Sequence, residues 1–107
     1  MTETPAPYHV YSRESHLQAH IVKRLRDAGW LVIVTSQDRR TRKQLRHIPD
    51  LICFRDNTTL LVECKRPGGQ LSEGQEEFED EVLCHTGRNL IYVVAYYLED
   101  VAEWTTV

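Results

Sequence analysis

A chain of 107 residues, 41% hydrophobic and 27% charged, is long enough for one domain with a buried core and has the composition of a globular protein. We expect neither a membrane span nor a secretory signal, because no apolar run approaches the roughly 20 residues that a span needs and the first residues lack a basic segment followed by an apolar one. The three cysteines are odd in number and lack metal-ligand spacing, and Cys53 and Cys64 lie inside apolar runs, which argues against a disulfide scaffold and fits a reducing, intracellular compartment.

The net charge of −3 conceals two segments of opposite sign. Five basic residues and one acid lie between Gln37 and His47, whereas six acids and no base lie between Glu73 and Glu81. The basic segment is either an ordinary solvated loop or a contact surface for a polyanion. We expect the acidic segment to be solvated and to point away from any nucleic acid.

Residues 1–11 carry two prolines and no regular apolar spacing, so we expect an arm there and a single domain over residues 12–107. A helix follows, with Ser12 as a candidate N-cap and Gly29 as a candidate C-cap. Glu14 falls on the apolar stripe of this helix, which predicts a carboxylate that faces the core. The other members of the stripe are Leu17, Ile21, Leu25 and Ala28.

Three strands are predicted next by short apolar runs separated by polar segments. Residues 31–35 read as a short buried strand, and residues 36–47 as a polar, basic loop. Residues 51–54 and 59–65 read as the two strands of a hairpin, because the intervening RDNT is rich in turn-forming residues.

A second helix is predicted to begin after Ser72 and to end near Gly87. Ser72 and Gln75 match a capping box, and Gln75 also falls on the inward side of the helix. A fourth strand over residues 90–97 and a short C-terminal helix complete the order αβββαβ. The fold class is therefore α/β, with a mixed four-stranded sheet flanked by helices.

The hairpin brings charged side chains together in an unexpected place. If Asp56 and Asn57 form a two-residue turn, Asp50 lies directly opposite Glu63, and Lys65 shares their face because side chains alternate along a strand. Two carboxylates this close repel each other unless a cation lies between them. Lys65 supplies part of that charge, and a divalent cation that prefers oxygen ligands would supply the rest.

Two further polar side chains are predicted to reach the same place from the two helices. Glu14 and Gln75 each point inward from near the start of a helix, which favours a single polar site over a structural salt-bridge cluster. For Gln75 an alternative stays open, because the capping box alone accounts for a glutamine at that position.

The motifs resemble the PD-(D/E)xK nuclease superfamily, and in particular its VRR-NUC branch. The motif PD at Pro49–Asp50 is followed thirteen residues later by E-x-K at Glu63–Lys65. The branch also has a helical Glu before the first strand, then "PDL", "vEvK" and "G-x-L-S-x-x-Q", which here read Glu14, PDLI, VECK and GQLSEGQ. The resemblance covers residues 12–98. It departs from the family at His47, where a Gly is usual.

The resemblance implies a restriction-endonuclease-like core and a set of site residues. Lys65 would orient or deprotonate a water molecule or stabilise the reacting phosphorus, and Gln75 would position Lys65 or a water. The implied ligands of Mg²⁺ or Mn²⁺ are Asp50, Glu63, the backbone carbonyl of Cys64 and, directly or through water, Glu14.

The implied function is divalent-metal-dependent DNA endonuclease activity, selective for branched DNA such as Holliday junctions and carried out by a homodimer in the cytoplasm of a bacterial cell or phage-infected host. Strand 90–97 or the C-terminal segment would form the dimer interface. The alternatives are a monomeric nuclease for flaps, nicks or single strands, and a non-catalytic DNA-binding module. The expected contacts to the DNA backbone are Arg39, Arg40, Arg42, Lys43, Arg46 and His47.

Overall fold

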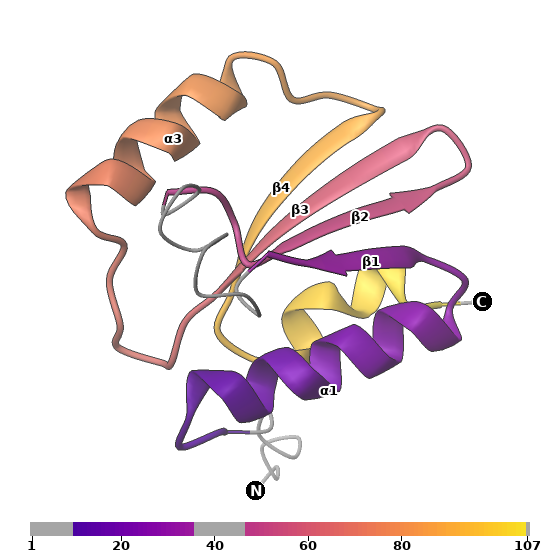
Figure 1. Cartoon of the computed structure of the whole chain (residues 1–107), viewed down its shortest axis with the longest axis horizontal. Coiled ribbons are helices and arrows are strands. Elements are labelled where there is room, and N and C mark those ends of the chain that lie inside the picture. The colour runs from indigo at the N-terminus through magenta and orange to yellow at the C-terminus, as the bar shows by residue number, and fades with distance from the viewer. Residues whose placement is uncertain (1–9, 36–46, 107) are drawn as a thin grey trace, which may run out of the picture.

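The computed structural model describes residues 10–35 and 47–106. Helices pack on both faces of a four-stranded sheet (Figure 1). The elements are α1 (Glu14–Asp27), β1 (Leu31–Val34), β2 (Leu51–Arg55), β3 (Thr58–Cys64), α3 (Glu73–Leu83), β4 (Leu90–Ala95) and the 3-10 helix η1 (Leu98–Trp104). This order confirms the α/β class with a mixed sheet.

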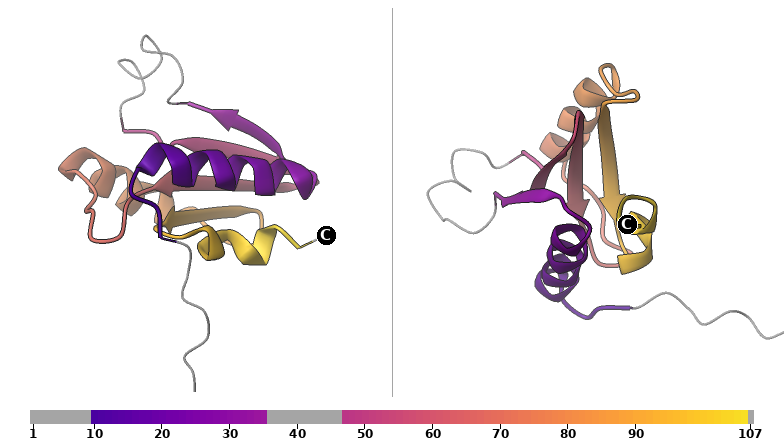
Figure 2. Two further views of the ribbon diagram at one scale, coloured as in Figure 1. Left: turned by 90° about the horizontal axis from the view of Figure 1, so that it is seen from below. Right: turned by 90° about the vertical axis from the view of Figure 1, so that its right-hand side faces the viewer.

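The strands follow one another across the sheet in the order β1-β2-β3-β4. The strand β2 is antiparallel to both β1 and β3, whereas β4 runs parallel to β3. A parallel return requires a crossover, and α3 supplies it. Figure 2 shows α1 and η1 beneath the sheet and α3 at its other side.

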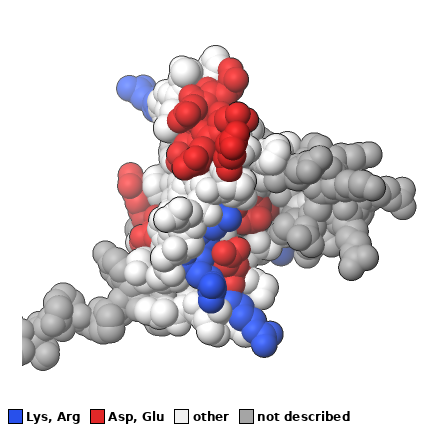
Figure 3. All heavy atoms as spheres, turned by 90° about the vertical axis from the view of Figure 1, so that its left-hand side faces the viewer, with Lys and Arg blue, Asp and Glu red and all other residues white. Residues whose placement is uncertain are grey.

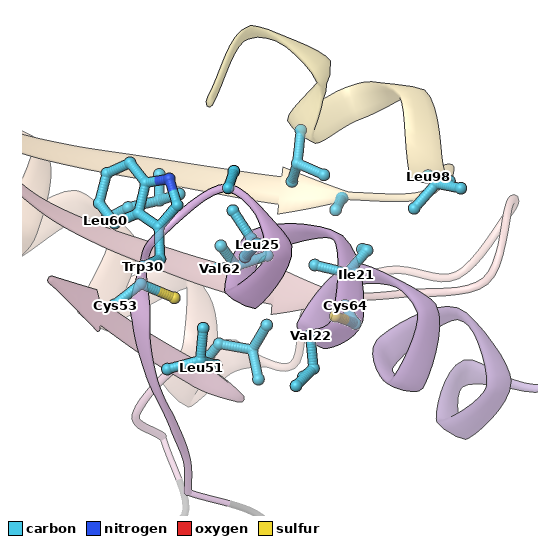
Figure 4. Packing of buried hydrophobic residues seen from close by; sticks show 14 of the residues in the cluster. Ile21, Val22, Leu25, Trp30, Leu51, Cys53, Leu60, Val62, Cys64 and Leu98 are labelled. Atoms are coloured by element: carbon cyan, nitrogen blue, oxygen red, sulfur yellow. The ribbon is translucent and has the colours of Figure 1, made fainter. Parts of the chain in front are cut away.

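The core lies between α1, η1 and one face of the sheet (Figure 4). Leu17, Ile21 and Leu25 recur at helical spacing on α1 and are completely buried, as the sequence predicts. From the sheet, alternate residues point toward them, so Leu60 and Val62 are buried on this face. The intervening residues of β3, including Glu63, therefore project toward the face that carries α3.

The start of α1 differs from the prediction in two ways. The N-cap is Arg13, not Ser12, and it makes no side-chain capping hydrogen bond. Glu14 is exposed rather than core-facing, because the first residue of a helix lies at the end of the packed stripe. Its carboxylate instead accepts a hydrogen bond from the backbone N–H of Arg66, at 3.3 Å.

One predicted burial and the predicted ends of two elements are also wrong. The first strand is not buried on both faces, because β1 is at the edge of the sheet and Leu31 and Ile33 are 63% and 46% exposed. The helix α3 ends at Leu83, four residues before Gly87, and its last turn is tightened by the bond from the His85 N–H to the Val82 carbonyl at 2.8 Å. The last strand ends at Ala95 because the Asp100 carboxylate accepts the next two backbone N–H groups, which removes them from the ladder.

The hairpin register is as predicted. Leu51 lies opposite Val62 and Arg55 opposite Thr58, which is the pairing that a two-residue turn gives. Asp56, the first turn residue, has φ 55°, a conformation that aspartate tolerates better than most residues. The next pair outward is Asp50 and Glu63, so the turn at one end of the hairpin fixes the alignment of two carboxylates at the other.

Candidate active site

Asp50 and Glu63 meet where β2 begins and β3 ends. Asp50 directly precedes β2, and its carboxylate Oδ2 accepts a hydrogen bond from the backbone N–H of Cys64 at 2.9 Å. Glu63 is 3% exposed, on the same face of the hairpin. Both carboxylates are therefore held at one place on the sheet, as the register predicts.

Thr35 holds Asp50 in place from the end of β1. Its hydroxyl donates a hydrogen bond to the carbonyl of Pro49 at 2.7 Å, and its backbone N–H donates to the carbonyl of Asp50 at 2.9 Å. Sequence reasoning missed this contact. The register between β1 and β2 cannot be read across the long segment that joins them, whereas the hairpin register can be read from its short turn.

Gln75 makes two sets of contacts at once. Its side-chain carbonyl accepts a hydrogen bond from the N–H of Ser72 at 2.8 Å, and its own N–H donates to the Ser72 hydroxyl at 3.2 Å, which completes the predicted capping box. Its amide Nε2 donates to Glu63 Oε2 at 2.9 Å. The two interpretations of Gln75 left open by the sequence are therefore compatible, because opposite ends of one amide serve them.

Lys65 completes the group on the same face. Its ammonium Nζ lies 3.9 Å from Glu63 Oε2, and the two side chains are 15% and 4% exposed. The backbone N–H of Lys65 donates to the carbonyl of Ala95 at 2.9 Å, which extends the pairing of β3 and β4 beyond the last strand residue. The ammonium group is thus carried on a fixed backbone.

Burial and mutual repulsion make this pair of carboxylates difficult to ionise. Burial, followed by the negative charge of Asp50, raises the pKa of Glu63 from 4.5 to about 8, and Lys65 opposes the shift. Burial also raises the pKa of Asp50, against the hydrogen bond from the Cys64 N–H. Any cation that binds between the two carboxylates would remove their repulsion.

The chemistry of these groups fits a divalent cation of the Mg²⁺ type. Within residues 10–35 and 47–106, no group of three or more His, Cys, Asp or Glu side chains is arranged to hold a metal. Mg²⁺ commonly uses one or two protein carboxylates and fills its remaining positions with water and substrate phosphate. Asp50 and Glu63 match that pattern in number and type, and the backbone carbonyl of Cys64 stays an expected ligand. The Glu14 carboxylate is turned toward the Arg66 N–H. Of its two expected roles, direct ligand or ligand through a water molecule, the second fits this position.

His47, where a glycine is usual in the family, packs against the start of α3. Its imidazole ring occupies the space that a Cβ atom on Gly74 would take. The larger residue at position 47 is thus matched by the absence of a side chain at position 74. This contact explains how the chain that leads into Asp50 tolerates a histidine.

A double-mutant cycle tests this matching of sizes. Gly74→Ala should raise stability by about 0.5–1 kcal/mol in a His47→Ala background, because alanine favours a helix over glycine. With His47 present the gain should vanish, because the imidazole must move. Urea unfolding of the four proteins measures both effects. An equal gain in the two backgrounds would contradict the contact.

Charged side chains are unevenly distributed over this side of the molecule. Figure 3 shows a dense acidic cluster over α3, and below it Lys and Arg side chains with a few acidic ones beside them. Of the six acids between Glu73 and Glu81 all but Glu79 are exposed, as predicted for a solvated face. The predicted DNA contacts Arg39, Arg40, Arg42, Lys43 and Arg46 lie outside the described residues. No helix in the part of the chain that the structure describes is long and apolar enough to span a membrane.

Comparisons with known proteins agree with these motifs. The family model described as VRR-NUC domain matches residues 2–96. A solved structure of a VRR_NUC domain superposes with a TM-score of 0.63 over 84% of this chain and 94% of its own, at 20% identity, which shows a shared fold. The crossover junction endodeoxyribonuclease Hjc of Sulfurisphaera tokodaii is 40% identical over 60 residues, a match that spans 55% of this chain and 40% of that protein.

Proposed function

Because the chain belongs to the VRR-NUC family of nuclease domains, we propose that it is a divalent-metal-dependent endonuclease that hydrolyses DNA phosphodiester bonds at Asp50, Glu63 and Lys65. The observation that carries the proposal is the burial of two adjacent carboxylates beside a lysine. A binding surface for DNA would gain nothing from carboxylates that repel phosphate. A non-catalytic DNA-binding module is therefore the weaker alternative.

Each residue of the site has a role that follows from its contacts. Asp50, Glu63 and the Cys64 carbonyl would hold Mg²⁺ or Mn²⁺, which when bound lowers the pKa of a water ligand and neutralises phosphate charge. Lys65, next to Glu63, would orient the attacking water or accept its proton, or donate to the phosphate oxygens as charge develops. Gln75 would fix the orientation of the Glu63 carboxylate through its amide.

We further propose branched DNA, such as a Holliday junction, as the substrate. The support is the name of the related protein, a crossover junction endodeoxyribonuclease, although this chain spans 40% of that protein's length. A two-fold dimer would present two sites to two strands of a four-way junction, so that protein symmetry matches substrate symmetry. We also propose a cytoplasmic location in a bacterial cell or phage-infected host, on the basis of the family resemblance alone.

The exposed apolar side chains favour the β1–β2 part of the sheet as the dimer surface. Leu31 lies directly opposite Phe54, and the two are 63% and 40% exposed, next to Ile33 at 46%. On β4, by contrast, Tyr92 packs against Phe78 of α3, with ring centroids 6.4 Å apart. If two copies of the protein met through these apolar side chains across a two-fold axis, the side chains of both copies would be buried from water.

A panel of labelled DNAs tests the substrate. The protein is incubated with a four-way junction, a flap, a nicked duplex, an intact duplex and a single strand, each with Mg²⁺ or Mn²⁺. We expect paired, symmetric incisions in the junction and a dimer by light scattering at the same concentration. Preferential single incisions in flap, nicked or single-stranded DNA by a monomer would support the monomeric alternative and contradict the junction proposal.

A further inference from the structure

The backbone of Arg66 is fixed on both sides immediately after the site. Its N–H donates to the Glu14 carboxylate at 3.3 Å, and its carbonyl accepts a hydrogen bond from the Gly69 N–H at 2.8 Å. The second bond closes a four-residue turn in which Pro67 has its fixed φ and Gly68 has φ 88°, the pattern of a type II turn. Proline and glycine are the residues that such a turn favours at these two positions.

The side chain of Arg66, in contrast to its backbone, is exposed. Two other cations of the described part of the chain already have partners. Lys23 forms an ion pair with Asp27 at 2.9 Å, and the guanidinium of Arg55 lies 4.5 Å from the centre of the Trp30 ring. Arg66 forms no ion pair with another residue of the described segments. A fixed backbone with an uncommitted guanidinium is suited to binding an anion with little loss of chain entropy.

The charges around the site restrict where a DNA strand can lie. Figure 3 shows the acidic cluster over α3 and, below it, Lys and Arg side chains with a few acidic side chains beside them. Arg66 directly follows Lys65, so the turn at residues 66–69 begins immediately after the site. A phosphate chain that reaches Glu63 and Lys65 is repelled by α3 and attracted to the turn at residues 66–69.

We propose that Arg66 binds a DNA phosphate next to the scissile one, so that the strand crosses the site over the turn at residues 66–69 and away from α3. This inference rests on the proposed function and adds to it the path of the substrate. The contact is made before and during the reaction alike. Loss of Arg66 should therefore weaken binding and leave the chemical step nearly unchanged.

The test compares Arg66→Ala with Arg88→Ala, both in a Lys65→Ala background that prevents cleavage. Arg88 is a matched control because it is also exposed but precedes β4, at the opposite end of the strands from the site. Fluorescence anisotropy with a labelled four-way junction measures the dissociation constant between 50 and 200 mM salt, roughly the range over which phosphate contacts dominate. Arg66→Ala should raise the Kd by about tenfold and lower the salt slope by about one, whereas Arg88→Ala should change neither.

The outcomes separate this inference from the proposed function. An unchanged Kd and salt slope in Arg66→Ala would overturn the role of Arg66, even if the wild type cleaves DNA. A protein that binds DNA but never cuts it would defeat the nuclease proposal and leave the comparison of the two arginines valid. In the cleaving protein, Arg66→Ala should raise KM and preserve kcat, and Arg66→Lys should recover part of the affinity because it keeps the charge. A fall in kcat at unchanged KM would also overturn the proposal.

Discussion

Substitution of Lys65 by Ala is expected to lower the single-turnover rate of DNA cleavage by about 100-fold to 10,000-fold, the usual range for loss of a group that transfers a proton or stabilises developing charge. The ammonium of Lys65 is largely buried beside Glu63, and alanine carries no group that could take its place. Binding of the same DNA should persist, because most of the affinity comes from contacts to other phosphates.

Lys23→Ala is the matched control for this experiment. Lys23 is also a lysine in an ion pair with a carboxylate, but its side chain is 78% exposed and its partner is Asp27 on the same helix. This variant should cleave at the wild-type rate. Equal cleavage by the wild type and by Lys65→Ala would exclude Lys65 from the chemistry and would remove the main argument for the site.

The second large effect concerns Glu63→Gln, which should abolish metal-dependent cleavage but stabilise the metal-free protein above neutral pH. Folding raises the pKa of Glu63 from 4.5 to about 8, so the folded state favours the protonated carboxyl. The stabilisation by this group is fully present below pH 4.5 and is lost as the pH rises through about 8. Glutamine stays neutral throughout and can still accept the hydrogen bond from the Gln75 amide.

Thermal denaturation in EDTA across this pH range measures the effect. Between pH 5 and pH 9, the Tm of the wild type should fall by several degrees more than the Tm of Glu63→Gln. The reason is that each pKa unit corresponds to about 1.4 kcal/mol of stability, and each kcal/mol moves Tm by about 4–8 °C in a domain of this size. Glu77→Gln, at an exposed position on α3, should follow the wild type. Parallel curves for wild type and Glu63→Gln would contradict the burial of the charge. Mg²⁺ should restore the stability of the wild type at high pH and leave Glu63→Gln unaffected.

The sequence was most informative where structure is local. The αβββαβ order followed from apolar spacing and turn residues, and the two-residue turn at Asp56 was sufficient to align Asp50 with Glu63. The capping box at Ser72 and Gln75 also depends only on neighbouring residues. In each case the interacting groups are close in sequence or joined by a short turn.

Long-range features could not be predicted in this way. That β1 lies at the edge of the sheet depends on the order of the strands, which apolar runs do not encode. Glu14 matches the spacing of the buried stripe but lies at its end, so its contact with the Arg66 N–H arises only from the docking of α1 beside the loop after β3. The support of Asp50 by Thr35 likewise requires the β1–β2 register.

The central claim is that Asp50 and Glu63 are the place where a divalent cation binds. Mn²⁺ broadens the NMR signals of nearby nuclei, so titration of substoichiometric Mn²⁺ into the ¹⁵N-labelled protein, followed by amide spectra, locates the ion without requiring tight binding. The amides of Asp50, Glu63, Cys64 and Lys65 should broaden first, and those near Arg88 last. Broadening centred on the exposed acids of α3, with the signals of residues 50 and 63–65 unaffected, would contradict the site.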